Sequence, residues 1–485
     1  MAHRGSGHST LGSGEGEVQV ISKKVPLVDD ELTENLAPTY GSRFFVEDVP
    51  KYKLPAKGMP PEAAFHMIMD ELNLEGNPPL NLASFVTTWM EPQAEALIAK
   101  NNYRNFIDRE EYPQTGVIHD RTVNMLARLY HAPEDLTAVG TSAIGSSEAI
   151  MLGLLAHKWN WRKKREAAGK PTNKPNLVMG ANTHIVWDKF ARYFDVEPRV
   201  IPMQLDRYTI TAEEVEALVD ENTIAVGAVV GTTFTGEADP VKDINDMLEG
   251  VLEKKGWDIP IHVDGASGGF TTPFLHPHLE WDFRLPHVKS INASGHKYGL
   301  VYPGVGWLIF RDQADLPDEL VFSVNYLGGE EETFTLNFSK AATMVLAQYY
   351  NFIRLGYEGY KRIMETCMEN AKYLMHVAHK GGRAISLVPM EELFMPVLVF
   401  KAAEPGVSGA QLSATLRQSG WIVPAYTLPP KADSLEVMRV VVKENFSRDM
   451  AEMLVDDMRQ SYAEITGESP IPEAAKTNKT QHGAC

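Results

Sequence analysis

Two patterns of hydrophobic residues alternate along the middle of the chain. Short apolar runs rich in β-branched residues are typical of buried strands, and segments with apolar residues every three or four positions are typical of helices. Strands that alternate with helices predict an α/β fold, with a mostly parallel sheet whose binding site lies at the carboxyl ends of the strands. The predicted strands are 177–180, 199–203, 224–230, 259–263, 288–293 and 306–310, and the helices between them are 183–193, 212–219 and 241–255.

Helical spacing dominates on both sides of this region. The polar and aromatic segment 105–113 interrupts it and is expected to lie outside a core. The last elements mix strands and helices, as a small α+β domain does. The predicted helices are 61–75, 91–101, 122–131, 145–164, a long one with breaks over 338–375, 409–419 and 448–466, and the predicted strands are 397–400 and 437–442.

Changes in composition mark the expected domain boundaries. Residues 1–20 are rich in Gly, Ser and His and poor in large apolar residues, which is typical of a loosely attached arm. The C-terminal residues are polar and typical of a mobile tail. We predict an N-terminal arm and segment (1–80), a large domain (81–365), a small C-terminal domain (366–468) and a tail (469–485).

Charge and cysteine content exclude several classes of protein. The 485 residues carry 46 basic and 64 acidic side chains, and the net charge of −18 argues against a nucleic-acid or anionic-membrane surface. Two cysteines, Cys367 and Cys485, supply neither a disulfide framework nor a cysteine-based metal site. No apolar run reaches membrane-spanning length, and the first residues lack the apolar core of a signal peptide. We expect a cytoplasmic protein without a metal site.

A lysine follows the predicted strand 288–293, in the sequence Ser294-Gly295-His296-Lys297. Lysines are mostly exposed, so a surface lysine in a turn is one interpretation. The other is a reactive amine, because lysine forms Schiff bases with carbonyl compounds such as pyridoxal phosphate when its pKa is lowered.

Other candidate residues stand where a strand ends or a helix begins. Asp264 follows a buried strand and could pair with the protonated pyridine nitrogen of pyridoxal phosphate, or simply cap the next turn. Ser146 and Ser147 open a helix, where they could bind a phosphate or serve as a plain N-cap. Thr233 lies in a Gly- and Thr-rich turn that could contact a ligand, and His184 stands near a helix start.

The order of these features is more specific than any one of them. A phosphate cradle, a ring-stacking candidate, an aspartate after a strand and then Lys297 all belong at one edge of one sheet. That is the layout of the large domain of aspartate-aminotransferase-like (fold type I) pyridoxal-phosphate enzymes.

From about residue 40 to 466 the sequence resembles the glutamate decarboxylases of bacteria and plants. The resemblance implies decarboxylation of L-glutamate to 4-aminobutanoate and carbon dioxide with uptake of a proton, on pyridoxal 5′-phosphate. The matching motifs are residues 81–92, 110–113, 139–140, 145–149, 189–194, 262–264, 266–270 and 294–299.

The resemblance also implies roles for individual residues. Lys297 binds the cofactor as a Schiff base, Asp264 pairs with its ring nitrogen, and His184 stacks over the ring, where the family members place Gln. The residues implied for cofactor binding are Ser146, Ser147, Thr233, Asp264, Ser294, His296, Lys297 and, toward the neighbouring subunit, Ser339.

For the substrate, Arg439 is implied to hold the α-carboxylate. Ser84, Phe85, Asn105 and Asp108 are implied to line the pocket for the distal carboxylate. The family forms homodimers with shared active sites, often assembled into hexamers.

The tail differs from that of the plant members of this family, and other functions of the same fold are alternatives to glutamate decarboxylation. The tail lacks the Trp and dense Lys of calmodulin-binding plant tails, so we predict no calmodulin control. The same scaffold also supports aminotransfer, aromatic-amino-acid decarboxylation and cleavage of phosphate-ester carbon–carbon bonds. A catalytically silent protein of this fold is a further alternative, against which the presence of Lys297 and Asp264 argues.

Overall fold

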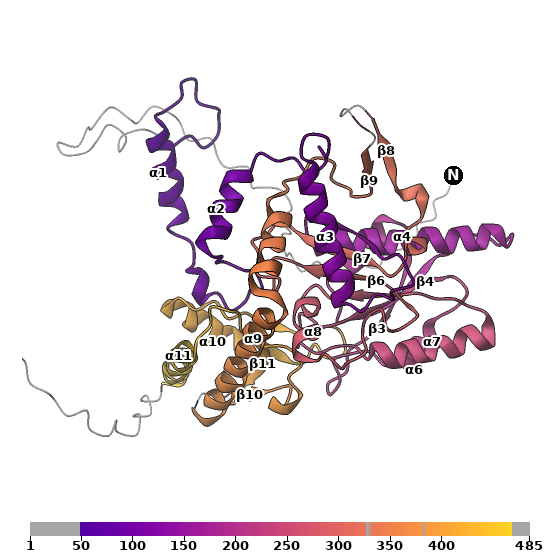
Figure 1. Cartoon of the computed structure of the whole chain (residues 1–485). Coiled ribbons are helices and arrows are strands. Elements are labelled where there is room, and N and C mark those ends of the chain that lie inside the picture. The colour runs from indigo at the N-terminus through magenta and orange to yellow at the C-terminus, as the bar shows by residue number, and fades with distance from the viewer. Residues whose placement is uncertain (1–48, 326–328, 330, 382–383, 468–485) are drawn as a thin grey trace, which may run out of the picture. The chain divides into compact units, whose positions relative to one another are not determined.

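The computed structural model describes residues 49–325, 329, 331–381 and 384–467 (Figure 1). The predicted arm and tail lie outside the described residues. The chain divides into two compact units at Glu75–Gly76, and each unit is described by itself. The domain boundaries expected at residues 81, 366 and 469 stay predictions.

The first unit contains one described helix, α1 (Pro61–Leu72). It confirms the helix predicted over 61–75 and ends three residues earlier. A proline opens the helix, where its missing N–H leaves no donor unsatisfied. Phe65 and Ile68 are each 61% exposed.

The second unit is built on a seven-stranded sheet with the order β1-β7-β6-β5-β4-β2-β3. The four pairs from β6 to β3 are parallel, as predicted, whereas β7 runs antiparallel to both β6 and β1. The strands are β1 (Val139–Ala143), β2 (Asn176–Gly180), β3 (Glu197–Ile201), β4 (Thr223–Val229), β5 (Ile261–Asp264), β6 (Val288–Ser294) and β7 (Gly306–Phe310).

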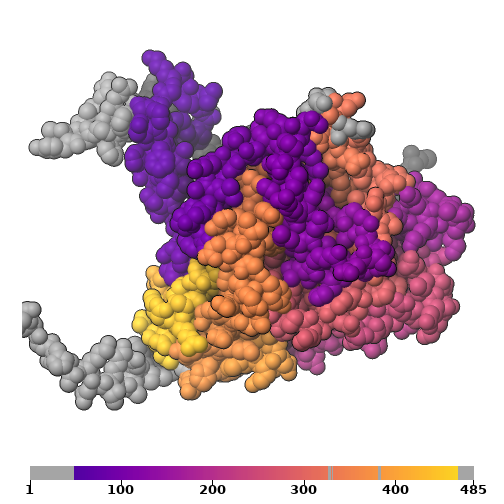
Figure 2. Space-filling view, viewed as in Figure 1, coloured from indigo at the N-terminus to yellow at the C-terminus, as the bar shows by residue number. Residues whose placement is uncertain are grey.

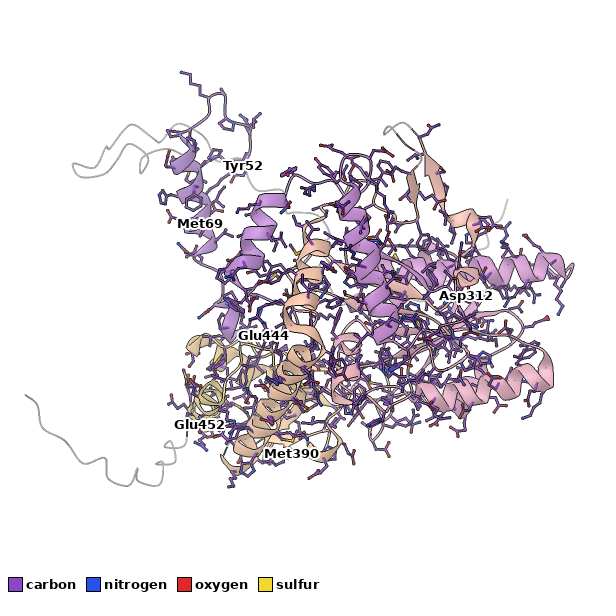
Figure 3. The ribbon with its side chains drawn as sticks, viewed as in Figure 1. Tyr52, Met69, Asp312, Met390, Glu444 and Glu452 are labelled. Carbon is purple, nitrogen blue, oxygen red and sulfur yellow. The ribbon has the colours of Figure 1, made fainter. Side chains whose placement is uncertain are left out.

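Helices cover both faces of this sheet, so its central strands are buried along nearly their whole length, and β5 and β6 carry polar residues within this buried layer. Leu177 and Met179 of β2 belong to the apolar cluster that includes Trp187, whereas Val178 between them belongs to the cluster of Leu248. Side chains fill the space between these layers (Figure 3). The helices are α2 (Pro92–Asn101), α3 (Pro113–Leu129), α4 (Ser146–Ala167), α5 (Val186–Tyr193), α6 (Ala212–Leu218), α7 (Val241–Lys255) and α8 (Thr272–Leu275).

A smaller antiparallel sheet with the order β10-β11-β13-β12 follows, as the expected α+β pattern requires. The long helix α9 leads into it and breaks at Gly356, whose φ of 60° lies in the left-handed region that favours glycine. Tyr373 of α9 donates a hydrogen bond to Glu452 of α11, which Figure 3 labels. The elements are α9 (Thr343–Gly381), β10 (Ala384–Ser386), β11 (Val397–Ala402), α10 (Gly409–Leu416), β12 (Ala425–Thr427), β13 (Glu436–Val441) and α11 (Arg448–Thr466), and a separate hairpin pairs β8 (Phe322–Val324) with β9 (Glu331–Thr333).

Two expectations about the first half of this unit were wrong. Helix α3 begins at Pro113, nine residues before the predicted start, because a proline suits the first helical position. The preceding segment was expected outside a core, yet Phe106 and Ile107 are buried, and Phe106 packs edge-on against His119. Helices α3 and α9 lie side by side on one face (Figure 2).

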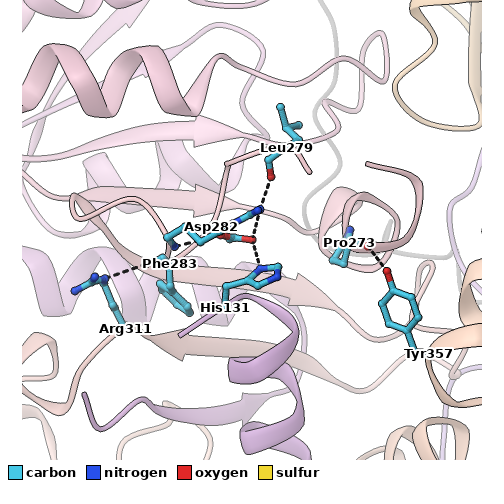
Figure 4. A network of polar contacts seen from close by, with 8 residues as sticks. His131, Pro273, Leu279, Asp282, Phe283, Arg311 and Tyr357 are labelled. Carbon is cyan, nitrogen blue, oxygen red and sulfur yellow. Dashed lines mark hydrogen bonds and ion pairs between the residues drawn. The ribbon is translucent and has the colours of Figure 1, made fainter. Parts of the chain in front are cut away.

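A polar network holds the segment that leads into β6 (Figure 4). The buried Asp282 carboxylate accepts hydrogen bonds from His131 Nδ1 at 2.8 Å and from Arg284 Nε at 2.8 Å. Arg311 Nε donates to the carbonyl of Phe283 at 3.2 Å. These contacts anchor the start of β6, whose other end carries site residues. Among the described residues, no helix has the length and apolar character needed to span a membrane.

Candidate active site

A cavity of about 180 Å³ lies at the carboxyl ends of β5 and β6, where the parallel sheet was expected to place a site. Asp264 is the last residue of β5 and Ser294 the last of β6, and Lys297 follows three residues later. Every predicted catalytic residue lines this cavity. Its lining includes Gly145, Ser146, Ser147, Asn182, His184, Thr233, Asp264, Ser267, Ser294, His296 and Lys297.

The Asp264 carboxylate is held by three N–H donors. Its Oδ1 accepts from the backbone of Ala266 at 3.0 Å and from Asn292 Nδ2 at 3.1 Å. Its Oδ2 accepts from Trp187 Nε1 at 3.1 Å. A buried carboxylate requires such partners. Among the described residues Oδ2 has only this one donor, so it keeps a lone pair for a protonated ring nitrogen.

The Lys297 amine lies beside this carboxylate. Its Nζ donates to Ser267 Oγ at 3.0 Å and lies 5.1 Å from the centre of the Phe85 ring. Burial lowers the pKa of Lys297 to about 8, against the pull of Asp264, because a desolvated ammonium is disfavoured. An amine that loses its proton near neutral pH is suited to attack an aldehyde.

The N-terminus of α4 forms the opposite part of the cavity. Among the residues that the structure describes, no side chain caps this helix, so the N–H groups of its first turn remain for an anion. Ser146 Oγ and Ser294 Oγ share a hydrogen bond of 2.6 Å. A Cβ on Gly306 would lie 2.5 Å from the backbone nitrogen of Ser146, so only glycine permits this approach of β7.

Two histidines border the same cavity. His296 Nδ1 lies 3.3 Å from the carbonyl of Val305, and burial lowers the pKa of its imidazole. His184 Nδ1 accepts the backbone N–H of Val186 at 3.3 Å. Desolvation lowers the pKa of His184 as well, opposed by the nearby Asp264. Both rings are therefore neutral at physiological pH, as a stacking group or a hydrogen-bond donor to phosphate can be.

These residues fit pyridoxal 5′-phosphate. The uncapped helix and its serines match the phosphate, the free lone pair of Asp264 matches the ring nitrogen, and the Lys297 amine matches the aldehyde. The close approach of β7 to the start of α4, which only glycine at position 306 permits, is an independent structural feature of the same cavity.

Arg439 of β13 reaches this region from the smaller sheet. Its two terminal nitrogens donate to the carbonyls of Thr233 and Ala83, the latter at 2.6 Å. Its guanidinium lies 5.1 Å from the Phe85 ring centre, on the ring that Lys297 Nζ also contacts. Arg439 Nε is buried without a hydrogen-bond partner among the described residues, which leaves a charged donor available for a carboxylate.

The substrate-binding residues predicted earlier in the chain divide into two groups. Phe85 packs against Lys297, whose Nζ lies 5.1 Å from its ring centre, and Thr87 donates its hydroxyl to the Lys297 carbonyl at 2.8 Å. Neither Ser84 nor Phe85 is part of the cavity lining itself. Ser84 Oγ accepts the backbone N–H of Val86.

Asn105, Asp108 and Ser339 form the second group, outside the lining of this cavity. Asn105 Nδ2 donates to Ser339 Oγ at 3.4 Å, and the backbone of Asp108 donates to the Asn105 carbonyl at 3.3 Å. The three residues are therefore neighbours, but the cavity of their own chain is built without them. Their predicted roles, like those of the cavity residues, remain predictions.

Sequence reasoning assigned no role to Trp187, Asn292, Ser267 or Asn182. A signal existed for Asn292, because the period of two in a strand puts it on the face of Ser294. Ser267 belongs to the motif that follows Asp264. No local sequence pattern singled out Trp187, whose indole reaches Asp264 from helix α5.

Comparison with known proteins gives one consistent result. Residues 55–403 match the pyridoxal-dependent decarboxylase conserved domain. A glutamate decarboxylase of Solanum lycopersicum is 51% identical over 440 residues, covering 90% of this chain and 87% of that protein. A glutamate decarboxylase of Aliivibrio fischeri is 45% identical over 447 residues, covering 92% of this chain and 95% of that protein.

Solved structures give the same fold. A glutamate decarboxylase of Lactobacillus brevis superposes with a TM-score of 0.85 at 42% identity, covering 90% of this chain and 99% of that chain. A sphingosine-1-phosphate lyase of Burkholderia pseudomallei has a TM-score of 0.72 at 21% identity, covering 87% and 94%, which is a likeness of fold alone.

Proposed function

This chain belongs to the pyridoxal-dependent decarboxylase family, and we propose that it converts L-glutamate to 4-aminobutanoate and carbon dioxide. The observation that carries the proposal is the placement of Lys297 Nζ and the Arg439 guanidinium on one Phe85 ring, each 5.1 Å from its centre. An α-amino acid carries its amine and its carboxylate on the same carbon, so an amine placed where the Lys297 amine lies would bring the carboxylate toward the Arg439 guanidinium. The relatives named above are glutamate decarboxylases, which supports glutamate as the substrate.

Each residue of the site has a distinct task in this scheme. Pyridoxal 5′-phosphate, when bound, supplies the electron sink for the carbon–carbon bond that breaks. Asp264 would hold a negative charge against the ring nitrogen, and Ser146 and Ser147 would hold the phosphate at the start of α4. Arg439 would bind the α-carboxylate and so hold the substrate in one orientation.

Proton transfer completes the reaction. Lys297 Nζ, whose pKa burial lowers to about 8, holds the proton that replaces the lost carboxylate at Cα. One proton is consumed for each carbon dioxide released. The protein is proposed to act in the cytoplasm, within 4-aminobutanoate biosynthesis.

A substrate panel tests the proposal. Purified protein with added cofactor should release carbon dioxide from L-glutamate, with kcat/KM roughly 100-fold or more above that for L-aspartate or an aromatic amino acid, because a site matched to a distal carboxylate rejects other side chains. Carbon dioxide capture and chromatography of 4-aminobutanoate measure both products. Release from an aromatic amino acid alone would contradict the substrate, and no release from any of them would favour a silent protein of this fold.

We also propose that the protein works as a homodimer with shared active sites. The support is that Asn105, Asp108 and Ser339 cluster together outside the cavity of their own chain. In a dimer with two-fold symmetry, such a cluster can complete the cavity of the second copy.

Mixing two defective variants tests this arrangement. Lys297→Ala and the double variant Asn105→Ala/Asp108→Ala should each be inactive alone, and refolded together at equal amounts should regain about a quarter of wild-type activity, because half the dimers are mixed and each has one intact site. Carbon dioxide release after co-refolding is the measurement, and each variant refolded alone is the control. A mixture that stays inactive would show that both residues serve their own chain.

A further inference from the structure

A continuous chain of buried hydrogen bonds leads away from the back of Asp264, through β5 and β6 to helix α4. Asn292 Nδ2 contacts Asp264 Oδ1 at 3.1 Å, and Asn292 Oδ1 contacts His262 Nε2 at 2.9 Å. His262 Nδ1 contacts Ser290 Oγ at 2.6 Å, which contacts His157 Nε2 at 2.7 Å. We call His157, Ser290, His262 and Asn292 the relay. None of its members lines the cavity.

The strand pairing places these residues next to one another. In the parallel register of β5 and β6, His262 is opposite Ser290 and Asp264 is opposite Asn292. These four strand residues have their side chains on one face of the sheet, because strand residues two apart do so. Helix α4 packs on this face through Gly153, where a Cβ would lie 2.8 Å from the His262 ring. Glycine at this position thus admits the imidazole between helix and sheet.

The direction of every bond in the relay follows from the carboxylate. Asp264 only accepts, so Asn292 must present its amide nitrogen to Asp264 and its oxygen to His262. His262 Nε2 therefore carries the proton that it donates to Asn292. Burial lowers the pKa of His262 to about 4, which keeps its ring neutral and its Nδ1 an acceptor.

The remaining two bonds are then determined as well. Ser290 must donate its hydroxyl to His262 Nδ1, so Ser290 Oγ accepts from His157 Nε2. Burial also lowers the pKa of His157 well below its usual value, which keeps this ring neutral. All four donors point toward Asp264, and hydrogen bonds aligned in this way strengthen one another.

We propose that the relay is a positioning device for the cofactor's ring nitrogen: it fixes the orientation and charge of Asp264 from behind, so that the free lone pair of Oδ2 faces the ring. This inference rests on the proposed function, because it concerns the pyridoxal 5′-phosphate of that reaction. If the serine hydroxyl were lost, His262 could exchange tautomers and Asn292 could turn its amide. The amide oxygen of Asn292 would then face the Asp264 carboxylate. Repulsion between these oxygens would displace the negatively charged carboxylate from its position for the ring nitrogen.

The experiment removes the Ser290 hydroxyl in the middle of the relay, which is separated from Asp264 by His262 and Asn292. Ser290→Ala is compared with Thr223→Val, a matched control in β4 of the same sheet. The Thr223 hydroxyl is also buried and also has two partners, donating to Asn176 Oδ1 at 2.8 Å and accepting from the backbone of Asp220 at 2.9 Å. Both variants lose a comparable pair of hydrogen bonds, but only Ser290 belongs to the relay.

Two readouts separate positioning from stability. Quenching of tryptophan fluorescence measures the Kd of pyridoxal 5′-phosphate for the apoprotein, and the ¹⁵N resonance of a ring-labelled cofactor reports the protonation of its nitrogen in the holoenzyme. Ser290→Ala should raise Kd about 3- to 10-fold, the range for one lost buried bond acting through a neighbour, and shift the resonance toward the unprotonated ring. Ser290→Thr, which keeps the hydroxyl, should restore both values, and Thr223→Val should change neither.

The outcomes distinguish the inference from the proposed function. If wild-type protein binds the cofactor and decarboxylates glutamate, but Ser290→Ala and Thr223→Val give the same Kd and the same ¹⁵N resonance, the relay has no positioning role. If Ser290→Ala does not fold, His157→Phe breaks the relay one step further out and must show the same two shifts. A wild-type protein that binds no pyridoxal 5′-phosphate would overturn the proposed function and this inference with it.

Discussion

Lys297→Ala is expected to abolish carbon dioxide release from L-glutamate, with kcat falling roughly 10³-fold or more, as for other enzymes that lose the group forming the covalent bond. The Lys297 amine is the group in the cavity able to bond an aldehyde and return a proton to Cα, and alanine can do neither. The variant should still fold, because among the described residues Nζ makes a single hydrogen bond, to Ser267. Single-turnover and steady-state carbon dioxide assays measure the loss, and circular dichroism checks the fold.

A control on the apoprotein shows whether the loss comes from the predicted chemistry. The pKa of Lys297 is lowered to about 8, so its deprotonated, reactive form should appear as pH rises from about 7 to 9, below the ~10.4 of an ordinary lysine. Labelling with an acylating reagent across this pH range, followed by peptide mapping, locates the site. Retained decarboxylase activity in Lys297→Ala, or labelling of Lys297 only above pH 10, would contradict the assigned role.

Asp264→Asn is expected to lower kcat roughly 10²- to 10⁴-fold and to weaken cofactor binding, comparable to other buried carboxylates that orient a catalytic ring. The substitution removes the negative charge that keeps the ring nitrogen protonated. It also creates a local conflict, since three N–H donors converge on this carboxylate and asparagine has a single oxygen to receive them. Steady-state kinetics and the ¹⁵N resonance of ring-labelled cofactor measure the two effects.

Asp282→Asn provides the matched control for this variant. Asp282 is also a buried carboxylate that accepts several N–H donors, from His131 and Arg284, but it lies in the network before β6 and outside the cavity (Figure 4). It should lower the melting temperature and leave kcat close to wild type. If the two variants lose activity equally, the effect of Asp264→Asn is a general cost of a buried asparagine rather than a loss of ring protonation.

Much of the fold was accessible from local pattern. The central strands β4 and β5 were predicted within two residues at each end, because largely apolar runs are typical of strands covered on both faces. Asp264 and Lys297 followed from the same pattern, since polar residues directly after such strands must lie at the edge of the sheet. The order of phosphate cradle, aspartate and lysine then restricted the chemistry before any distance was known.

Long-range packing decided what the pattern left open. Strand β7 was predicted as a strand, but only pairing with β6 and β1 makes it antiparallel. Phe106 lies in a polar stretch and is buried because His119 and Lys340 pack against it. Arg439 meets Phe85 although more than three hundred residues separate them in the chain.

The sequence by itself determined the elements of this protein and the residue types at the ends of its strands, because helix and strand periods are local properties of the chain. The tertiary structure decided which of those residues share one cavity and which, such as Asn105 and Ser339, lie outside it. It also decided the relay behind Asp264. The direction of that relay depends on which buried donors and acceptors satisfy one another, and such pairing exists only when two strands and a helix are packed together.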